Sequence, residues 1–229
     1  MFKKYVTDVF FDLDHTLWDF EKNSALTFDK IFLQNEVNVG LNDFLEVYIP
    51  INLHYWKLYR EERVSKPELR YQRLRKAFDE LNFSIDDELI NLLSEDYIKH
   101  LSSFNHVFPG TFEILNYLQS DYRLHIITNG FEEIQEKKMK SSNIRDYFEI
   151  VINSEMAGVK KPNPKIFKLA LDQAKVRPQN ALMIGDSLEA DIIGAKNLGF
   201  HVLHFNSHQE PKHQICEMID ELHEIKSFL

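Results

Sequence analysis

Acidic residues stand directly after two apolar runs of this 229-residue chain. Asp12 and Asp14 follow the run 9–11, and Asp186 follows the run 181–184 across a single glycine. Carboxylates in such positions suit a hard cation such as Mg²⁺, which takes oxygen ligands and often shares them with a substrate phosphate. A carboxylate can also attack phosphorus itself. The spacing predicts a divalent-cation site drawn from Asp12 and Asp186, although each acid taken alone is also typical of a turn or a helix cap.

Hydrogen-bond donors and a lysine follow at two further points of the chain. Thr128, Asn129 and Gly130 end an apolar run and offer a hydroxyl, a side-chain amide and accessible backbone N–H groups, which suit phosphoryl oxygens. Lys161 precedes Pro162, whose ring restricts the backbone and can fix the lysine before the next helix. We therefore predict that these residues bind phosphate. An Asn-Gly pair is also typical of a plain turn, and a lysine pair of an exposed basic loop.

The elements that must position these residues are five short apolar runs with the length of buried strands. Segments with helical spacing lie between most of them, which favours βαβ units and a parallel sheet. The carboxyl ends of parallel strands meet at one crevice, where ligands of open α/β folds bind. We expect a Rossmann-like α/β fold, a parallel sheet flanked by helices, that gathers the chemical residues at one edge. The predicted strands are residues 9–11, 124–127, 148–152, 181–184 and 201–205.

The interval between the first two strands breaks this alternation. From about residue 24 to residue 104 the apolar residues recur at helical spacing, and the segment is too long for an ordinary βα loop. It is predicted to be an inserted all-helical cap domain. We place this cap at residues 18–105 and the α/β core at residues 1–17 and 106–229.

Composition excludes several functional classes. Thirty-six acidic residues against twenty-seven basic ones leave a net charge of −9, which argues against a general nucleic-acid surface but not against a small phosphorylated metabolite. The single cysteine, Cys216, excludes an intrachain disulfide and fits a reducing compartment. No apolar run approaches the roughly 18 residues of a membrane span. We expect a cytoplasmic protein, monomeric or homodimeric, without a nucleic-acid polymer or a membrane as partner.

Taken in chain order, the four groups resemble the four motifs of the haloacid-dehalogenase superfamily of hydrolases. The branch they resemble is that of phosphatases with a helical cap inserted after the first motif. The resemblance spans essentially the whole chain, with the insertion matched by position and helical character more than by motif. The motifs are Asp12-Leu13-Asp14-His15-Thr16, Ile127-Thr128-Asn129, Lys161-Pro162, and Gly185-Asp186-Ser187 with Asp191 beyond.

The resemblance implies a role for each motif residue. Asp12 is the nucleophile, and Asp14 is the general acid that protonates the leaving alcohol and then activates water against the phospho-enzyme. Asp12, the backbone carbonyl of Asp14, and Asp186 hold Mg²⁺, while Asp191 supports the metal-bound waters or Lys161. The transferring phosphoryl group is bound by Thr128, Asn129, Gly130 and Lys161, of which the first and the last are catalytic.

Asp14 separates the reactions known in this superfamily. Dehalogenation needs no acid to protonate an alkoxide, and members with that activity lack the second aspartate, so a dehalogenase is disfavoured. Phosphomutases keep both acids but usually carry a glycine where this chain has Thr16. A noncatalytic phosphate-responsive binding protein is a further alternative, which the loss of a catalytic acid would favour. Because no such acid is missing, we predict phosphomonoester hydrolysis through an aspartyl-phosphate.

A finer resemblance is to house-cleaning pyrimidine 5′-nucleotidases, and it lies in residues 10–14, 126–131, 159–163 and 69–82. It implies a pyrimidine nucleoside 5′-monophosphate as substrate, with a sugar phosphate or other small metabolite as the near alternative. Aromatic side chains could stack on the base, and arginines could meet polar substrate groups. Most of these aromatics are more typical of a hydrophobic core than of a substrate site. The candidates in the insertion are Trp18, Trp56, Tyr71, Arg70 and Arg73.

Overall fold

The computed structural model describes residues 2–229, which divide into two compact units. One unit, called here the sheet unit, comprises the chain up to Phe20 together with Asn105–Leu229, and the other, the helical unit, comprises Glu21–Phe104. Residues 18–20 and residue 105, which the sequence analysis assigned to the insertion, belong to the sheet unit. The reason is local, because the backbone of Trp18 forms bridges to Asp14 and to Val107.

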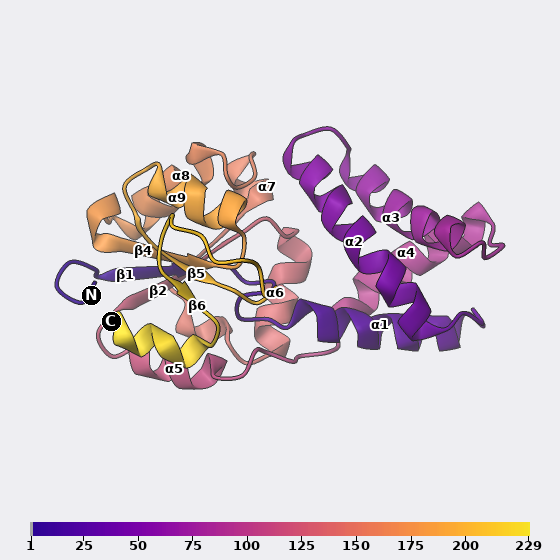
Figure 1. Cartoon of the computed structure of the whole chain (residues 1–229), viewed down its shortest axis with the longest axis horizontal. Helices are drawn as coiled ribbons and strands as arrows, with labels where there is room; N and C mark the ends of the chain where they lie inside the picture. The colour runs from indigo at the N-terminus through magenta and orange to yellow at the C-terminus, as the bar shows by residue number, and fades with distance from the viewer. Residues whose placement is uncertain (1) are drawn as a thin grey trace. The chain divides into compact units, whose positions relative to one another are not determined.

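The sheet unit is built on six parallel strands in the order β3-β2-β1-β4-β5-β6. The predicted parallel α/β fold is confirmed, and β6 is a short strand that the sequence analysis did not predict. Figure 1 shows helices on both faces of this sheet. The strands are β1 Asp8–Phe11, β2 Arg123–Thr128, β3 Ile150–Asn153, β4 Ala181–Gly185, β5 His201–Phe205 and β6 Met218–Ile219.

Helices α8 and α9 cover one face of the sheet, and α5 lies on the other with the C-terminal 3-10 turn 222–227 (Figure 1). The first face is closed by a core in which Phe10, Ile127 and Met183 pack with Phe167 of α8, all without exposed surface. Burying such side chains contributes roughly 1.5–3 kcal/mol each. The helices of this unit are α5 Thr111–Leu118, α6 Glu132–Ser141, α7 Ser154–Ala157, α8 Pro164–Ala174 and α9 Gly194–Lys196.

Four helices form the helical unit, and no strand occurs among its residues, 21–104. Ser65 starts the third of them with a capping box, in which its side chain accepts from the backbone of Glu68 while Glu68 accepts from the backbone of Ser65. Aromatic rings fill the centre, where Phe28 lies 4.6 Å from Tyr48 and 4.7 Å from Tyr97 between ring centroids. The helices are α1 Phe20–Gln34, α2 Leu41–Arg60, α3 Lys66–Glu80 and α4 Asp87–Leu101.

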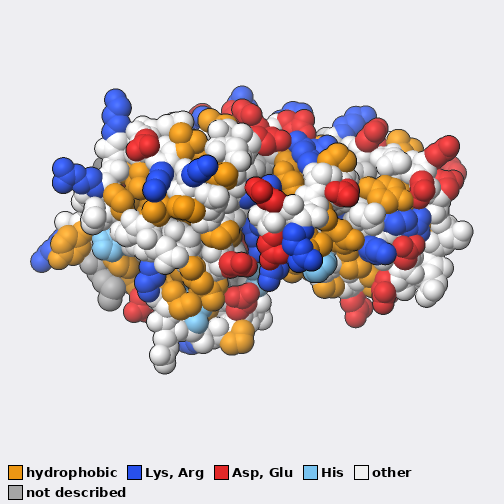
Figure 2. Space-filling view, turned by 90° about the horizontal axis from the view of Figure 1, so that it is seen from above, with side chains coloured by type: hydrophobic (Ala, Val, Ile, Leu, Met, Phe, Trp, Pro, Cys, Tyr) orange, Lys and Arg blue, Asp and Glu red, His pale blue; other side chains and the backbone are white. Residues whose placement is uncertain are grey.

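Two further observations concern the charge of the surface and the helices as possible membrane spans. Acidic and basic side chains are interspersed over the face of the molecule drawn in Figure 2, in keeping with a chain of both charge signs and a net charge of −9. Within residues 2–229, none of the helices combines the length and the apolar character needed to cross a membrane.

Candidate active site

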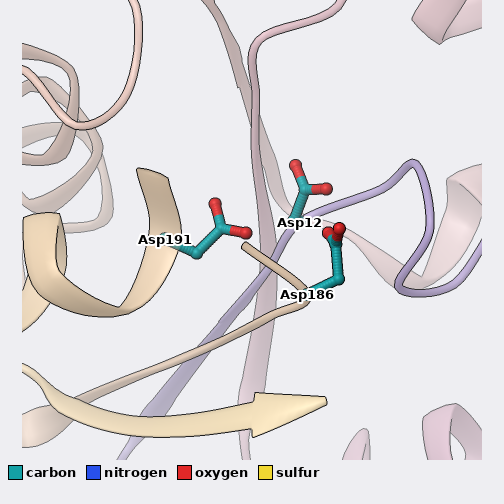
Figure 3. A group of neighbouring side chains, drawn as sticks. All are labelled: Asp12, Asp186 and Asp191. Carbon is teal, nitrogen blue, oxygen red and sulfur yellow. The ribbon is translucent and has the colours of Figure 1, made fainter. Parts of the chain in front are cut away.

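The strand register brings the first and fourth motifs together. Phe11 of β1 stands opposite Ile184 of β4, so Asp12 and Asp186 leave neighbouring strands at the same edge of the sheet. Asp191 joins them from a π-helical turn, Leu188–Ile193, that follows β4. Carboxylate oxygens of the three acids all lie within 4.8 Å of one another. Figure 3 shows these side chains converging on a common space from three points of the chain.

Gly185 makes room for this arrangement. A Cβ atom at position 185 would stand only 2.3 Å from an Asp191 carboxylate oxygen, far inside any normal contact. The glycine of the fourth motif therefore serves the approach of Asp191, beyond permitting the turn that the sequence analysis expected.

Lys161 is the cation that the three carboxylates surround. Its ammonium nitrogen lies 2.5 Å from Asp12 Oδ1 and 2.7 Å from Asp191 Oδ1, and it donates to the backbone carbonyl of Ile127 at 2.7 Å. The side chain is almost completely buried. Burial by itself would lower the pKa of Lys161, but the charges of Asp12 and Asp191 outweigh it and raise that pKa above its ordinary value. The lysine therefore stays charged.

The three acids differ in the direction in which the protein shifts their pKa. Burial raises the pKa of Asp12 well above its ordinary value, and the neighbouring Asp191 and Asp186 add to this while Lys161 opposes it. Burial likewise raises the pKa of Asp191. For Asp186, burial acts in the same direction, but a hydrogen bond with His208 and nearby positive charges outweigh it, so its pKa is lowered. The carboxylates of Asp12 and Asp191, which are buried, and of Asp186, which is partly buried, outnumber the one ammonium and leave negative charge that a divalent cation would balance.

This donor set fits Mg²⁺, which prefers hard oxygen ligands and is held by few carboxylates. Asp12, the backbone carbonyl of Asp14, and Asp186 are the ligands that the motif predicts. The structure adds the Asp191 carboxylate to the same group, whereas the sequence analysis had given it a supporting role. The Asp14 carboxylate is not a member of this group.

Asp14 instead faces helix α6. Its Oδ1 accepts a hydrogen bond from Lys138 Nζ at 2.5 Å, and its Oδ2 accepts one from Gln135 Nε2 at 2.9 Å. The same Gln135 nitrogen lies 2.7 Å from Thr128 Oγ1, so one amide connects the first motif to the second. The two motif acids thus occupy different surroundings, although only Leu13 separates them.

Asn129 has a positioning contact that the sequence analysis did not foresee. Its Oδ1 accepts from the backbone N–H of Lys161 at 2.7 Å, and its Nδ2 donates to the backbone carbonyl of the same residue at 3.0 Å. This two-point contact fixes the loop that carries the lysine. The Asn129 amide is therefore engaged with Lys161, while Thr128 Oγ1 accepts from the backbone N–H of Gly130 at 3.1 Å.

Several residues around Asp186 were also missed. His208 Nε2 lies 3.1 Å from Asp186 Oδ2, Thr16 Oγ1 donates to Asp186 Oδ1 at 3.2 Å, and His204 Nε2 lies 2.6 Å from the Asp186 backbone oxygen. Thr16 and His208 hold the carboxylate in one orientation, and His204 holds the backbone of the same residue. His208 sits on an irregular loop with no motif around it, so nothing in the sequence pattern indicated its position.

The five substrate candidates of the insertion fall into two sets. Trp18 and Arg73 are buried: the Trp18 indole donates to Ser142 Oγ at 3.0 Å, and Arg73 donates to Asn52 and lies 4.9 Å over the Tyr97 ring. Their packing favours core roles. The other three are partly exposed, namely Trp56, Arg70 and Tyr71, the last with its hydroxyl 2.5 Å from Asp87.

Sheet order, motif positions and the carboxylate group together define a hydrolase of the haloacid dehalogenase kind. Residues 9–199 match the family described as haloacid dehalogenase-like hydrolase, so the chain belongs to that family.

Individual relatives cover nearly the full chain. The pyrimidine 5′-nucleotidase YjjG of Escherichia coli (strain K12) is 32% identical over 225 residues, 96% of each chain. The glyceraldehyde 3-phosphate phosphatase of Pyrococcus abyssi is 36% identical over 199 residues, 86% of this chain and 80% of that protein. Among solved structures, the HAD-hydrolase YfnB from Bacillus subtilis bound to magnesium superposes with a TM-score of 0.86 at 27% identity and covers 98% of both chains.

Proposed function

We propose that this protein is a Mg²⁺-dependent phosphatase that hydrolyses pyrimidine nucleoside 5′-monophosphates through an aspartyl-phosphate. The observation that carries the proposal is that two acids at the end of β1 have different surroundings. Asp12 lies among carboxylates and Lys161, whereas Asp14 is bound by a residue of α6. The likeness to a pyrimidine 5′-nucleotidase over 96% of the chain supports the substrate class.

In this proposal a carboxylate oxygen of Asp12 attacks phosphorus, and the bond from phosphorus to the leaving alcohol breaks. Asp14 gives its proton to the leaving oxygen and then takes a proton from the water that attacks the aspartyl-phosphate, which regenerates the Asp12 carboxylate. Lys161 keeps Asp12 oriented, and the Thr128 hydroxyl, which accepts from the Gly130 backbone N–H, donates its own hydrogen to a phosphoryl oxygen. Asp12, the backbone carbonyl of Asp14, and Asp186 would hold the Mg²⁺, with Asp191 beside them, and the ion would supply positive charge that offsets the charge of the phosphoryl group.

A sugar-phosphate phosphatase is the second candidate, and the 36% identity to a glyceraldehyde 3-phosphate phosphatase favours it. The motif residues handle phosphate in either case, so they do not discriminate the two. The discrimination must come from groups that touch the rest of the substrate, for which Trp56, Arg70 and Tyr71 remain the proposed candidates.

The test is phosphate release from a panel of nucleoside 5′-monophosphates and sugar phosphates, with Mg²⁺ present or chelated. We expect turnover of uridine and thymidine monophosphates that is lost on chelation. Efficient release from sugar phosphates with inert nucleotides would replace the first candidate with the second. Tight binding of the same compounds without release from any of them would indicate the noncatalytic alternative.

A further inference from the structure

We propose that Gln135 and Lys138 of helix α6 are positioning residues that aim the Asp14 carboxylate at the leaving oxygen. The inference rests on the proposed phosphatase function. It starts from two buried polar residues, Gln135 at 1% and Lys138 at 2% exposure, whose side chains both donate to Asp14.

Helix α6 is placed for this task by the second motif. Its first residue, Glu132, follows Thr128, Asn129 and Gly130 within a few positions, so the motif and the helix form one strand-to-helix connection. Gln135 and Lys138 are three residues apart and lie on the buried face of the helix. A displacement of the motif loop would therefore move both side chains.

The contact with Asp14 is made at two points. Lys138 donates to Oδ1 and Gln135 donates to Oδ2, so each carboxylate oxygen has its own donor and the carboxylate cannot rotate without losing one. The Gln135 amide nitrogen carries two hydrogens, which allows it to donate to Thr128 Oγ1 at the same time. Its amide oxygen is buried without a hydrogen-bond partner among residues 2–229. An inverted amide would turn this oxygen toward a carboxylate, so the observed orientation is the one that Asp14 requires.

Gly130 provides the space for the Gln135 amide. A Cβ atom at position 130 would lie 2.3 Å from Gln135 Cδ and 2.4 Å from its Nε2. A side chain at position 130 would displace the Gln135 amide from Asp14. The glycine of the second motif is therefore needed for this contact as well as for the turn.

Lys138 is in turn held by Trp18. The ammonium nitrogen lies 4.3 Å from the centroid of the Trp18 ring and 5.2 Å from that of Phe20. Such contacts favour a cation over a neutral side chain. The Trp18 indole donates to Ser142, the residue just after α6, so the loop that follows Asp14 and the helix that holds Asp14 fix each other. This explains why Trp18 is buried in the sheet unit.

The experiment compares a substrate that needs leaving-group protonation with one that does not. Uridine 5′-monophosphate releases an alcohol, whereas p-nitrophenyl phosphate releases a stable phenolate, so protonation of the leaving group matters for the first alone. Because Asp14 also activates the water of the second step for both substrates, the first step is followed by itself, as release of the leaving group in a single turnover. In Lys138→Met and Gln135→Met we expect this single-turnover rate to fall about 30-fold or more for the nucleotide, within the usual range of general acid catalysis, with substrate affinity unchanged. The single-turnover rate for p-nitrophenyl phosphate should fall less than about 5-fold by the same reasoning.

Three controls make the result decisive. Lys140→Met changes an exposed lysine of the same helix that pairs with Glu136, and it should alter neither substrate. Lys138→Arg keeps the charge and the donors and should restore most of the nucleotide turnover if the loss is one of positioning. In Asp14→Asn, adding Lys138→Met should cause no further loss, because the two residues then act as one unit.

Different failures have different meanings. If the wild-type protein releases phosphate from neither substrate, the proposed function fails. If the wild-type protein is active but Lys138→Met and Gln135→Met slow both substrates equally, or add fully to Asp14→Asn, then α6 has only a structural role and the inference is overturned. A Lys138→Met protein that does not fold leaves Gln135→Met and the Lys138→Arg measurement to decide.

Discussion

A buried aspartate stands at each end of strand β1, and the protein shifts the pKa values of the two in opposite directions. Asp8, just inside the start of the strand, accepts from Thr7 at 2.6 Å and from Arg123 at 3.0 Å and lies 2.8 Å from His125 Nε2. Burial by itself would raise its pKa, but these hydrogen bonds outweigh it, and the pKa is lowered. At the other end, burial raises the pKa of Asp12 well above its ordinary value, despite Lys161.

The difference lies in what surrounds each acid. Around Asp8 the neighbours are donors and a cation, so the ionised form is fully satisfied within the protein. Around Asp12 the neighbours include two more carboxylates, so the site is left short of positive charge. We infer that the acid at the amino end of β1 stabilises the fold, whereas the acid at its carboxyl end is placed to bind ligands.

The largest expected effect is on activity, from Asp12→Asn. The amide cannot attack phosphorus, so turnover should fall by at least about 10³-fold. Removal of one of three crowded carboxylates should leave the metal-free unfolding temperature unchanged or higher. Phosphate release and thermal unfolding measure the two effects. The exposed Asp172→Asn is the matched control, and undiminished turnover in Asp12→Asn would refute the assigned nucleophile.

At the other end of the strand, Asp8→Asn should lower the free energy of unfolding by about 2–3 kcal/mol, somewhat less than a fully buried ion pair because Arg123 is 43% exposed. Turnover per folded molecule should not change. Denaturant unfolding and kcat of the purified variant check both statements. A loss of activity without a loss of stability would show that the two ends of β1 are not separate in function.

Binding of Mg²⁺ should stabilise the wild-type protein, because only the folded chain gathers the three carboxylates. At about ten times the dissociation constant the gain is about 1.4 kcal/mol. Asp186→Asn should abolish most of this gain, and Asp172→Asn should keep it. Thermal unfolding with and without Mg²⁺ is the measurement, and an equal shift in Asp186→Asn would exclude Asp186 from the cation site.

The smallest effect is expected in the pH dependence of stability. Because the folded protein lowers the pKa of Asp8, the stabilisation by this residue is present above the unfolded value of about 4 and is lost as pH falls through the folded value. The difference in unfolding free energy between the wild-type protein and Asp8→Asn should therefore shrink as the pH is lowered from 6 toward 3. A difference that stays constant over this range would show that the ionisation of Asp8 does not stabilise the fold.

Local patterns in the sequence were enough to predict the sheet and the edge where the motifs meet. Val9, Phe10 and Phe11 are the buried apolar residues of β1, and the acid that follows them must leave at the carboxyl end of the strand. The two-residue strand β6 has no such pattern and was not predicted. Its pairing with β5 depends on a contact that a run of two apolar residues cannot indicate.

Long-range pairs account for most of what the sequence could not provide. Lys138 and Asp14 are 124 positions apart, as are Trp18 and Ser142, and no spacing rule connects them. Trp18 was therefore grouped with the aromatic residues of the insertion, although its partners lie in the sheet unit. One sequence signal could have drawn attention to α6. Gln135 and Lys138 stand next to the apolar residues Ile134 and Met139, so helical spacing places all four on one face.

The two motif glycines limit how this protein can be redesigned. At positions 130 and 185 a single methyl group would collide with a side chain of the following turn or helix, Gln135 in one case and Asp191 in the other. Libraries that seek a new phosphate-ester specificity should therefore keep both glycines and vary residues outside the motif turns. Alanine at either position would test how much misalignment the chemistry tolerates without changing any reactive group.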